Sequence, residues 1–122
     1  MFTSFEEMPV WKLAMEIAED VFALTESLPR KEDDGLTSQL RRSAVSISAN
    51  IAEGFGRMHS KDKTKFYCQS RGSTTETKSN LLYGCRVGYF DDASIQTLLL
   101  KIEDVWKQLN CLITTMHSSS HP

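Results

Sequence analysis

Apolar residues recur with a helical period through most of the chain, and this period constrains the fold more than any other feature. The clearest example is the segment 93–116, where apolar residues follow spacings of three and four. They are Ile95, Leu98, Leu99, Ile102, Val105, Trp106, Leu109, Leu112, Ile113 and Met116. Such spacing places them on one face of an α-helix. No segment has the alternation typical of a β-strand, so the sequence predicts an all-α protein.

Three further segments have the same period, and they span residues 9–28, 36–55 and 61–86. Pro29 cannot continue the first helix, and Ser60 is the predicted N-cap of the third. The centre of the third segment contains no large apolar residue, and propensity alone favours a loop there. We still predict a helix, because a break would leave its apolar ends without a common face.

Short polar connections join these four segments. Helices joined in this way favour an antiparallel, up-down-up-down four-helix bundle. Residues 1–116 are long enough for one domain with one core. We expect residues 117–122 to form a disordered tail.

A second pattern, of polar residues, runs along the segment 36–55. Its members recur at alternating spacings of four and three: Gln39, Ser43, Ser46, Asn50, Glu53 and Arg57. That spacing keeps one stripe facing a neighbouring helix. The segment 61–86 has a matching stripe of small and polar residues: Ser70, Ser73, Thr77, Asn80 and Gly84. We predict that these stripes, with Glu76 beside them, form a polar seam, and a structural network is favoured over a ligand or ion site.

Charge is distributed unevenly along the chain. Residues 1–35 carry three basic and nine acidic groups, and residues 91–122 carry two basic and four acidic groups. Residues 36–90 carry three acidic and nine basic groups: Arg41, Arg42, Arg57, Lys61, Lys63, Lys65, Arg71, Lys78 and Arg86. A basic middle can be a footprint for an anion such as RNA. Alternatively, acidic and basic helices attract one another inside one bundle.

The apolar surface of the segment 9–28 is wider than one buried face requires. Its arc is roughly 200°, against about 100° for a helix that is buried on one side. Trp11, Met15 and Phe22 continue the arc beyond the face that meets the core. We predict that these three residues form an interface between copies of the chain.

Catalytic and metal-binding templates match the sequence poorly. The three histidines have no metal-ligand spacing on a helix, and we expect neither a metal nor a cofactor. Ser60 and Lys63 have a serine–lysine spacing, but the companion motifs of acyl-transfer enzymes are missing. Glu53 and Glu76 could meet across two helices, and paired carboxylates can do acid–base work. An enzyme with this pair ranks third among the hypotheses.

The cysteines and the start of the chain favour a cytoplasmic protein. Cys68, Cys85 and Cys111 are odd in number and lack paired spacing, as is typical of reduced thiols. The first residues lack the basic flank and apolar stretch of a signal peptide. No apolar run approaches the roughly 18 residues of a membrane helix. We expect no membrane contact.

One long run in the basic middle is specific enough to indicate a family. Residues 38–57 are S-Q-L-R-R-S-A-V-S-I-S-A-N-I-A-E-G-F-G-R. Three shorter motifs accompany it: V-W-K-x-A from Val10, R-G-S-x-x-E from Arg71 and L-N-x-L-I from Leu109. Together, over residues 9–115, they resemble the four-helix bundle proteins encoded in intervening sequences of bacterial 23S ribosomal RNA genes, which carry R-R-A-x-S-I-x-x-N-I-A-E-G at this point.

The resemblance implies a bundle that assembles as a ring-shaped homopentamer without enzymatic activity. The chain is also similar to accessory proteins of diversity-generating retroelements, which bind a reverse transcriptase and nucleic acid through a basic surface. RNA or a reverse-transcriptase-like protein is therefore an expected partner. The chain departs from the family pattern at four positions where Ala or Leu is usual: Ser70, Thr74, Thr75 and Thr77. We expect the centre of the third helix to bury less apolar area.

The leading hypothesis is therefore a non-catalytic, homo-oligomeric module for nucleic acid or an RNA-handling protein. Its predicted nucleic-acid-binding residues are Arg41, Arg42, Arg57, Lys61, Lys63, Lys65, Arg71 and Lys78. The alternative is a structural scaffold or adaptor protein whose charge asymmetry serves only its own assembly.

Overall fold

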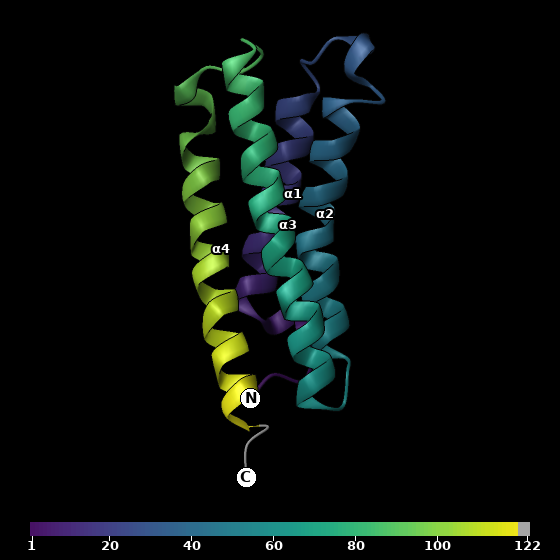
Figure 1. Cartoon of the computed structure of the whole chain (residues 1–122), viewed down its shortest axis with the longest axis vertical. Helices are drawn as coiled ribbons and strands as arrows, with labels where there is room; N and C mark the ends of the chain where they lie inside the picture. Colours follow the sequence, from purple (N-terminus) through teal and green to yellow (C-terminus); the bar gives the residue numbers. More distant parts are fainter. Residues whose placement is uncertain (120–122) are drawn as a thin grey trace.

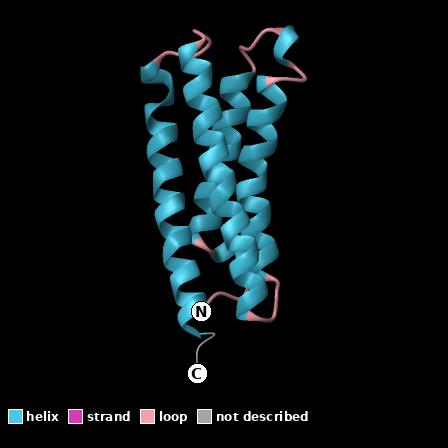
Figure 2. Ribbon diagram, viewed as in Figure 1, coloured by secondary structure: helices cyan, strands magenta, loops and turns pink. Residues whose placement is uncertain are grey.

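The computed structural model describes residues 1–119, and within this range the chain is helical, with no strand (Figures 1 and 2). The long helices are α1 (Pro9–Thr25), α2 (Leu36–Phe55), α3 (Ser60–Arg86) and α4 (Asp92–Ser119). Two short 3-10 helices, η1 (Phe5–Glu7) and η2 (Arg30–Glu32), precede α1 and α2. The all-α fold is confirmed.

The four long helices form a bundle around one core. Each helix contacts its neighbours in sequence, and α1 also contacts α4, which closes the bundle. Figure 1 shows the chain running up α1, down α2, up α3 and down α4. The core contains aliphatic side chains from all four helices, and among its most deeply buried members are Ile17, Leu40, Ile47, Ile51, Leu81 and Leu109. None of the helices within residues 1–119 is both long enough and apolar enough to span a membrane.

The polar centre of α3 is helical, as predicted. Ser70, Thr74 and Thr77 lie on its buried face, and all three are fully excluded from water. Their hydroxyl groups are hydrogen-bonded, for example from Thr74 Oγ1 to the carbonyl of Arg71 at 2.6 Å. A buried hydroxyl is tolerated when it has such a partner. Low helix propensity is therefore outweighed by tertiary packing.

Three predicted boundaries require correction. α1 ends at Thr25 instead of residue 28, with Glu26 as its C-cap. α3 begins at Ser60, so His59 is the N-cap, and it makes no side-chain capping bond. α4 continues to Ser119, so the expected tail does not start at residue 117. The rest of that tail, residues 120–122, lies outside the described residues.

A glycine near the end of α2 permits α3 to approach closely. A Cβ atom on Gly54 would lie 2.7 Å from Cε1 of Tyr67 and 3.2 Å from Cβ of Phe66. Tyr67 is buried in the core, so its ring has little room to move. Gly54 is therefore required here for space, one residue before α2 ends at Phe55.

We predict that Gly54→Ala lowers the free energy of unfolding by about 1–3 kcal/mol, because overpacking at Tyr67 outweighs the gain in helix propensity. Gly72→Ala is the matched control, since a Cβ on Gly72 would meet nothing within 4 Å. That control should stabilise α3 by about 0.5–1 kcal/mol. Urea denaturation measures both, and equal stabilisation by the two substitutions would contradict the steric role of Gly54.

Candidate functional site

Hydroxyl groups join α2 to α3 along the polar seam. Ser43 Oγ and Thr77 Oγ1 lie 2.8 Å apart, and Ser46 Oγ and Ser73 Oγ lie 2.9 Å apart. Ser43 and Thr77 are both buried, so their hydrogen bond forms away from water. Because a buried hydroxyl without a partner costs free energy, these pairs favour one register of α2 against α3.

Two further side chains continue the seam toward the turn between α2 and α3. Ser70 Oγ donates to the backbone carbonyl of Ile47 at 2.7 Å. Asn50 Nδ2 donates to the carbonyl oxygen and to Oγ of Ser46, at 2.9 and 3.0 Å. These polar groups bind one another across or along the helices, so the seam has the contacts of a structural network.

Four residues of the predicted seam lie outside its buried part. They are Gln39, Glu53, Arg57 and Glu76, and all are exposed. The register of α2 against α3 places Glu53 and Glu76 roughly 14 Å apart along the bundle, because each residue of a helix rises about 1.5 Å. The two carboxylates therefore do not meet. Within residues 1–119, no group of three His, Cys, Asp or Glu side chains could hold a metal ion.

The other end of the seam differs from the expected stripe of small residues. Asn80 Nδ2 is buried, and it has no hydrogen-bond partner within the described chain. A Cβ on Gly84 would collide with the ring of Phe90, which folds back from the turn after α3. Gly84 thus makes room for Phe90 and not for α2.

Arg41 and Arg71 are held by side chains of other helices. Arg41 Nε donates to Thr25 Oγ1 of α1 at 2.8 Å. Arg71 Nη1 donates to Asn110 Oδ1 of α4 at 2.8 Å. Both arginines are half-buried. Each guanidinium therefore links two helices, which limits its reach toward a ligand.

Lys63 closes the C-terminal end of α2. Its Nζ donates to the carbonyl oxygens of Gly54 at 3.2 Å and of Phe55 at 2.7 Å. A helix end leaves such carbonyls without partners, and a cation also suits the negative end of the helix dipole. Burial lowers the pKa of Lys63 below its ordinary value. Lys63 therefore acts as a structural cap, which its predicted role in binding nucleic acid did not anticipate.

Among residues 1–119, the basic residues of the middle segment form no ion pair with an acid of another helix. Of the nine basic residues between 36 and 90, only Arg57 forms an ion pair within the described chain, with Glu53 at 3.0 Å. The ion pairs that cross between described helices join Lys101 of α4 to Glu16 and Asp20 of α1, at 3.2 and 2.8 Å. The positive charge of α2 and α3 is therefore not neutralised by ion pairs inside the bundle.

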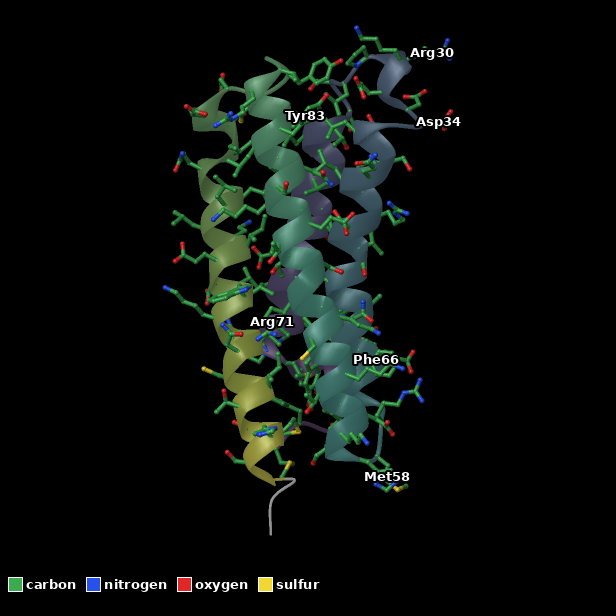
Figure 3. All side chains as sticks on the ribbon, in the orientation of Figure 1. Arg30, Asp34, Met58, Phe66, Arg71 and Tyr83 are labelled. Carbon is green, nitrogen blue, oxygen red and sulfur yellow. The ribbon has the colours of Figure 1, made fainter. Side chains whose placement is uncertain are left out.

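The densest group of cations surrounds the turn between α2 and α3. We call this group the turn cluster: Arg57, Lys61, Lys63 and Lys65. Met58 lies at the tip of the turn and is 86% exposed (Figure 3). Phe66, also labelled there, lies close by on the first turns of α3. Phe66 is not among the predicted binding residues, although an aromatic residue directly after closely spaced lysines indicates such a surface.

Arg42 and Lys78 lie apart from the turn cluster. Arg42 is in the first half of α2 and Lys78 in the second half of α3, so both are nearer the opposite end of the bundle. Lys78 lines an open groove of about 340 Å³ between α3 and α4, together with Thr74, Thr75, Ile102, Glu103 and Trp106. The eight predicted nucleic-acid-binding residues therefore do not form one continuous surface.

The predicted interface residues of α1 differ in their free surface. Trp11 is half-buried, and its ring packs edge-to-face on Phe5, with centroids 5.1 Å apart. Met15 is also half-buried. Phe22 is 53% exposed, and the guanidinium of Arg41 lies 4.3 Å from the centre of its ring. Phe22 therefore offers the most apolar surface of the three.

Comparison with known families decides where the chain belongs. The model of a family described as 23S rRNA-intervening sequence protein matches residues 6–111. The chain belongs to this family. The long run on α2 now has a physical explanation, because Ile47 and Ile51 lie in the core and Ser46 and Asn50 in the seam.

A solved structure from Bacteroides thetaiotaomicron has the same fold. It is described as a protein with unknown function from the S23 ribosomal protein family, and it superposes with a TM-score of 0.79. The two sequences are 22% identical, and the match covers 85% of this chain and 97% of that one. None of the curated proteins matches the sequence.

The polar seam leads to a prediction about stability. Thr77→Val should lower the free energy of unfolding by about 1–2 kcal/mol, because it removes the hydroxyl that binds Ser43 and the carbonyl of Ser73. Adding Ser43→Ala should cost less in this variant than in the wild-type protein, with a coupling of about 0.5–1 kcal/mol. Urea denaturation of the four proteins measures the coupling, and strict additivity would show that the Ser43–Thr77 pair does not stabilise the bundle.

Proposed function

We propose that this protein is a non-catalytic, homo-oligomeric RNA-binding module that contacts phosphates through its turn cluster. The observation that carries the proposal is the unpaired charge of α2 and α3. Within the described residues, none of their basic side chains forms an ion pair with an acid of another helix. Positive charge that is not used inside the protein is available for an external anion.

The turn cluster offers the best access to a phosphate backbone. Lys61 and Lys65 are exposed, and Arg57 remains partly exposed beside Glu53. Backbone N–H groups at the start of a long helix such as α3 also favour anions. The family description refers to sequences that interrupt 23S rRNA, which makes RNA the first ligand to test. Contacts of this kind recognise phosphates more than bases, so we expect little dependence on sequence.

A scaffold protein without a nucleic-acid role is the second candidate. Exposed acids on α1 and α4 would then attract the basic helices of a neighbouring copy. In this alternative the same basic surface binds a neighbouring copy of the chain instead of RNA. It predicts self-association that weakens with salt and no binding of RNA.

Exposed apolar residues on opposite edges of the bundle support self-association. Phe22 and Val45, on the edge formed by α1 and α2, are 53% and 55% exposed. Leu82 and Trp106, on the edge formed by α3 and α4, are each 42% exposed. Two different surfaces on opposite edges favour head-to-tail contacts, and such contacts close into rings when the rotation permits. The family resemblance suggests five subunits.

We predict that Lys61→Glu/Lys65→Glu weakens RNA binding about tenfold or more at low salt, because two phosphate contacts become repulsive. Fluorescence anisotropy with a labelled single-stranded RNA at several salt concentrations measures the effect. The slope of log affinity against log salt should also fall by about 1.4 for two lost contacts. Lys63 stays unchanged in this variant, since its substitution would uncap α2.

The matched control is Arg30→Glu/Lys31→Glu, which reverses two exposed charges at the opposite end of the bundle (Figure 3). Its net charge equals that of the test variant, and its affinity for RNA should stay within about twofold of the wild-type value. If the wild-type protein binds no RNA at low salt, the scaffold candidate replaces the RNA-binding proposal. Equal losses in both variants would show that only net charge matters.

We predict that the wild-type protein is an oligomer at micromolar concentration, and that Phe22→Glu/Val45→Glu or Leu82→Glu/Trp106→Glu disrupts it. Light scattering measures the mass. In a head-to-tail assembly each variant keeps one intact edge, so an equal mixture of the two should form a one-to-one complex. Met58→Glu, which changes an exposed apolar residue away from both edges, should remain oligomeric. A monomeric wild-type protein would contradict this prediction.

A further inference from the structure

Contacts between cations and aromatic rings are concentrated at the turn between α2 and α3. Four such contacts occur among residues 1–119, and three of them are at this turn. The guanidinium carbon of Arg57 lies 4.7 Å from the centre of the Phe66 ring, and Lys65 Nζ lies 5.6 Å from it. Lys63 Nζ lies 5.4 Å from the ring of Phe55. A surface that served only phosphates would not need these rings.

Two constraints hold Arg57 in place. The close approach of α3 at Gly54 brings Phe66 beside the end of α2. A Cβ atom on Gly54 would lie only 3.2 Å from Cβ of Phe66. Glu53 binds the guanidinium from one edge at 3.0 Å. The side chain of Arg57 is nevertheless 45% exposed. One side of the guanidinium thus rests on Phe66 while another part remains open to solvent.

We propose that Arg57, supported by Phe66, is a stacking platform for an unpaired base, so that the turn cluster selects single-stranded over double-stranded RNA. This inference rests on the proposed function, and it adds the class of RNA. A base can stack on a guanidinium plane or an aromatic ring, whereas a duplex keeps its bases stacked inside the helix. Lys61 and Lys65, which lie one turn apart on α3, would hold neighbouring phosphates.

The remaining contact of this kind provides an internal comparison. The guanidinium of Arg41 lies 4.3 Å from the centre of the Phe22 ring. Its Nε and Nη2 are occupied by Thr25 Oγ1 and the carbonyl of Phe22, at 2.8 and 3.4 Å. No run of lysines accompanies it in the sequence. Arg41 is therefore an arginine on a phenylalanine whose guanidinium is held by hydrogen bonds, and Arg42 is the one exposed cation next to it in the sequence.

The test compares three labelled RNA ligands of equal length, measured by fluorescence anisotropy at one low salt concentration. The ligands are a single strand of mixed sequence, the same ribose–phosphate chain without bases, and a duplex. The wild-type protein should bind the normal single strand about tenfold more tightly than the chain without bases. It should also bind the single strand more tightly than the duplex.

Arg57→Lys keeps the charge but removes the planar group. It should therefore reduce the tenfold preference for the normal single strand over the chain without bases to less than about threefold. Its affinity for the chain without bases should not change. Phe66→Leu should have the same effect, and Arg41→Lys is the control that should keep the full preference. Circular dichroism checks the fold, and Arg57→Lys suffices if Phe66→Leu does not fold.

The outcomes separate this inference from the proposed function. If the wild-type protein binds the normal strand and the chain without bases equally well, the stacking platform is overturned and RNA binding stands. An undiminished preference in Arg57→Lys would overturn the platform in the same way. If none of the three ligands binds, both proposals are overturned.

Discussion

Buried hydroxyl groups between α2 and α3 determine how these two helices lie together, and the rest of the structure depends on that contact. Ser43, Ser70 and Thr77 are excluded from water, so each requires a hydrogen-bond partner. A shift of α3 by one turn would separate Thr77 from Ser43 and leave both without their partner across the interface. Small side chains also bring the two backbones close together, and Gly54 extends that approach to the turn.

The same close approach organises the candidate binding surface. Lys63 reaches across to the last carbonyl groups of α2, so one lysine of the turn cluster stabilises the fold. Its neighbours Lys61 and Lys65 remain exposed. Phe66 lies under Arg57 because α3 starts directly beside the end of α2. Packing and the proposed binding are therefore divided among residues that are adjacent in the sequence.

Charge distribution connects the fold with the proposed function. Inside one chain, Glu16 and Asp20 of α1 pair with Lys101 of α4, and the cations of α2 and α3 have no such partner on another helix among the described residues. An arrangement of this kind is suited to an external anion, and in a ring of subunits it would be repeated. Repetition raises the effective concentration of binding sites without any new contact.

The sequence by itself determined the four helices and the seam between two of them, because apolar and polar periods of about 3.5 residues are local properties of a chain. It also contained the family signature. Only the tertiary structure decided which cations are free of contacts inside the protein. Arg71, for example, donates a hydrogen bond to Asn110, which is 39 residues away in the sequence. Gly84 likewise makes room for Phe90, which no period indicated. Such contacts depend on how helix ends and turns fold back on one another. The spacing of residues along one helix contains no information about which distant residues will meet.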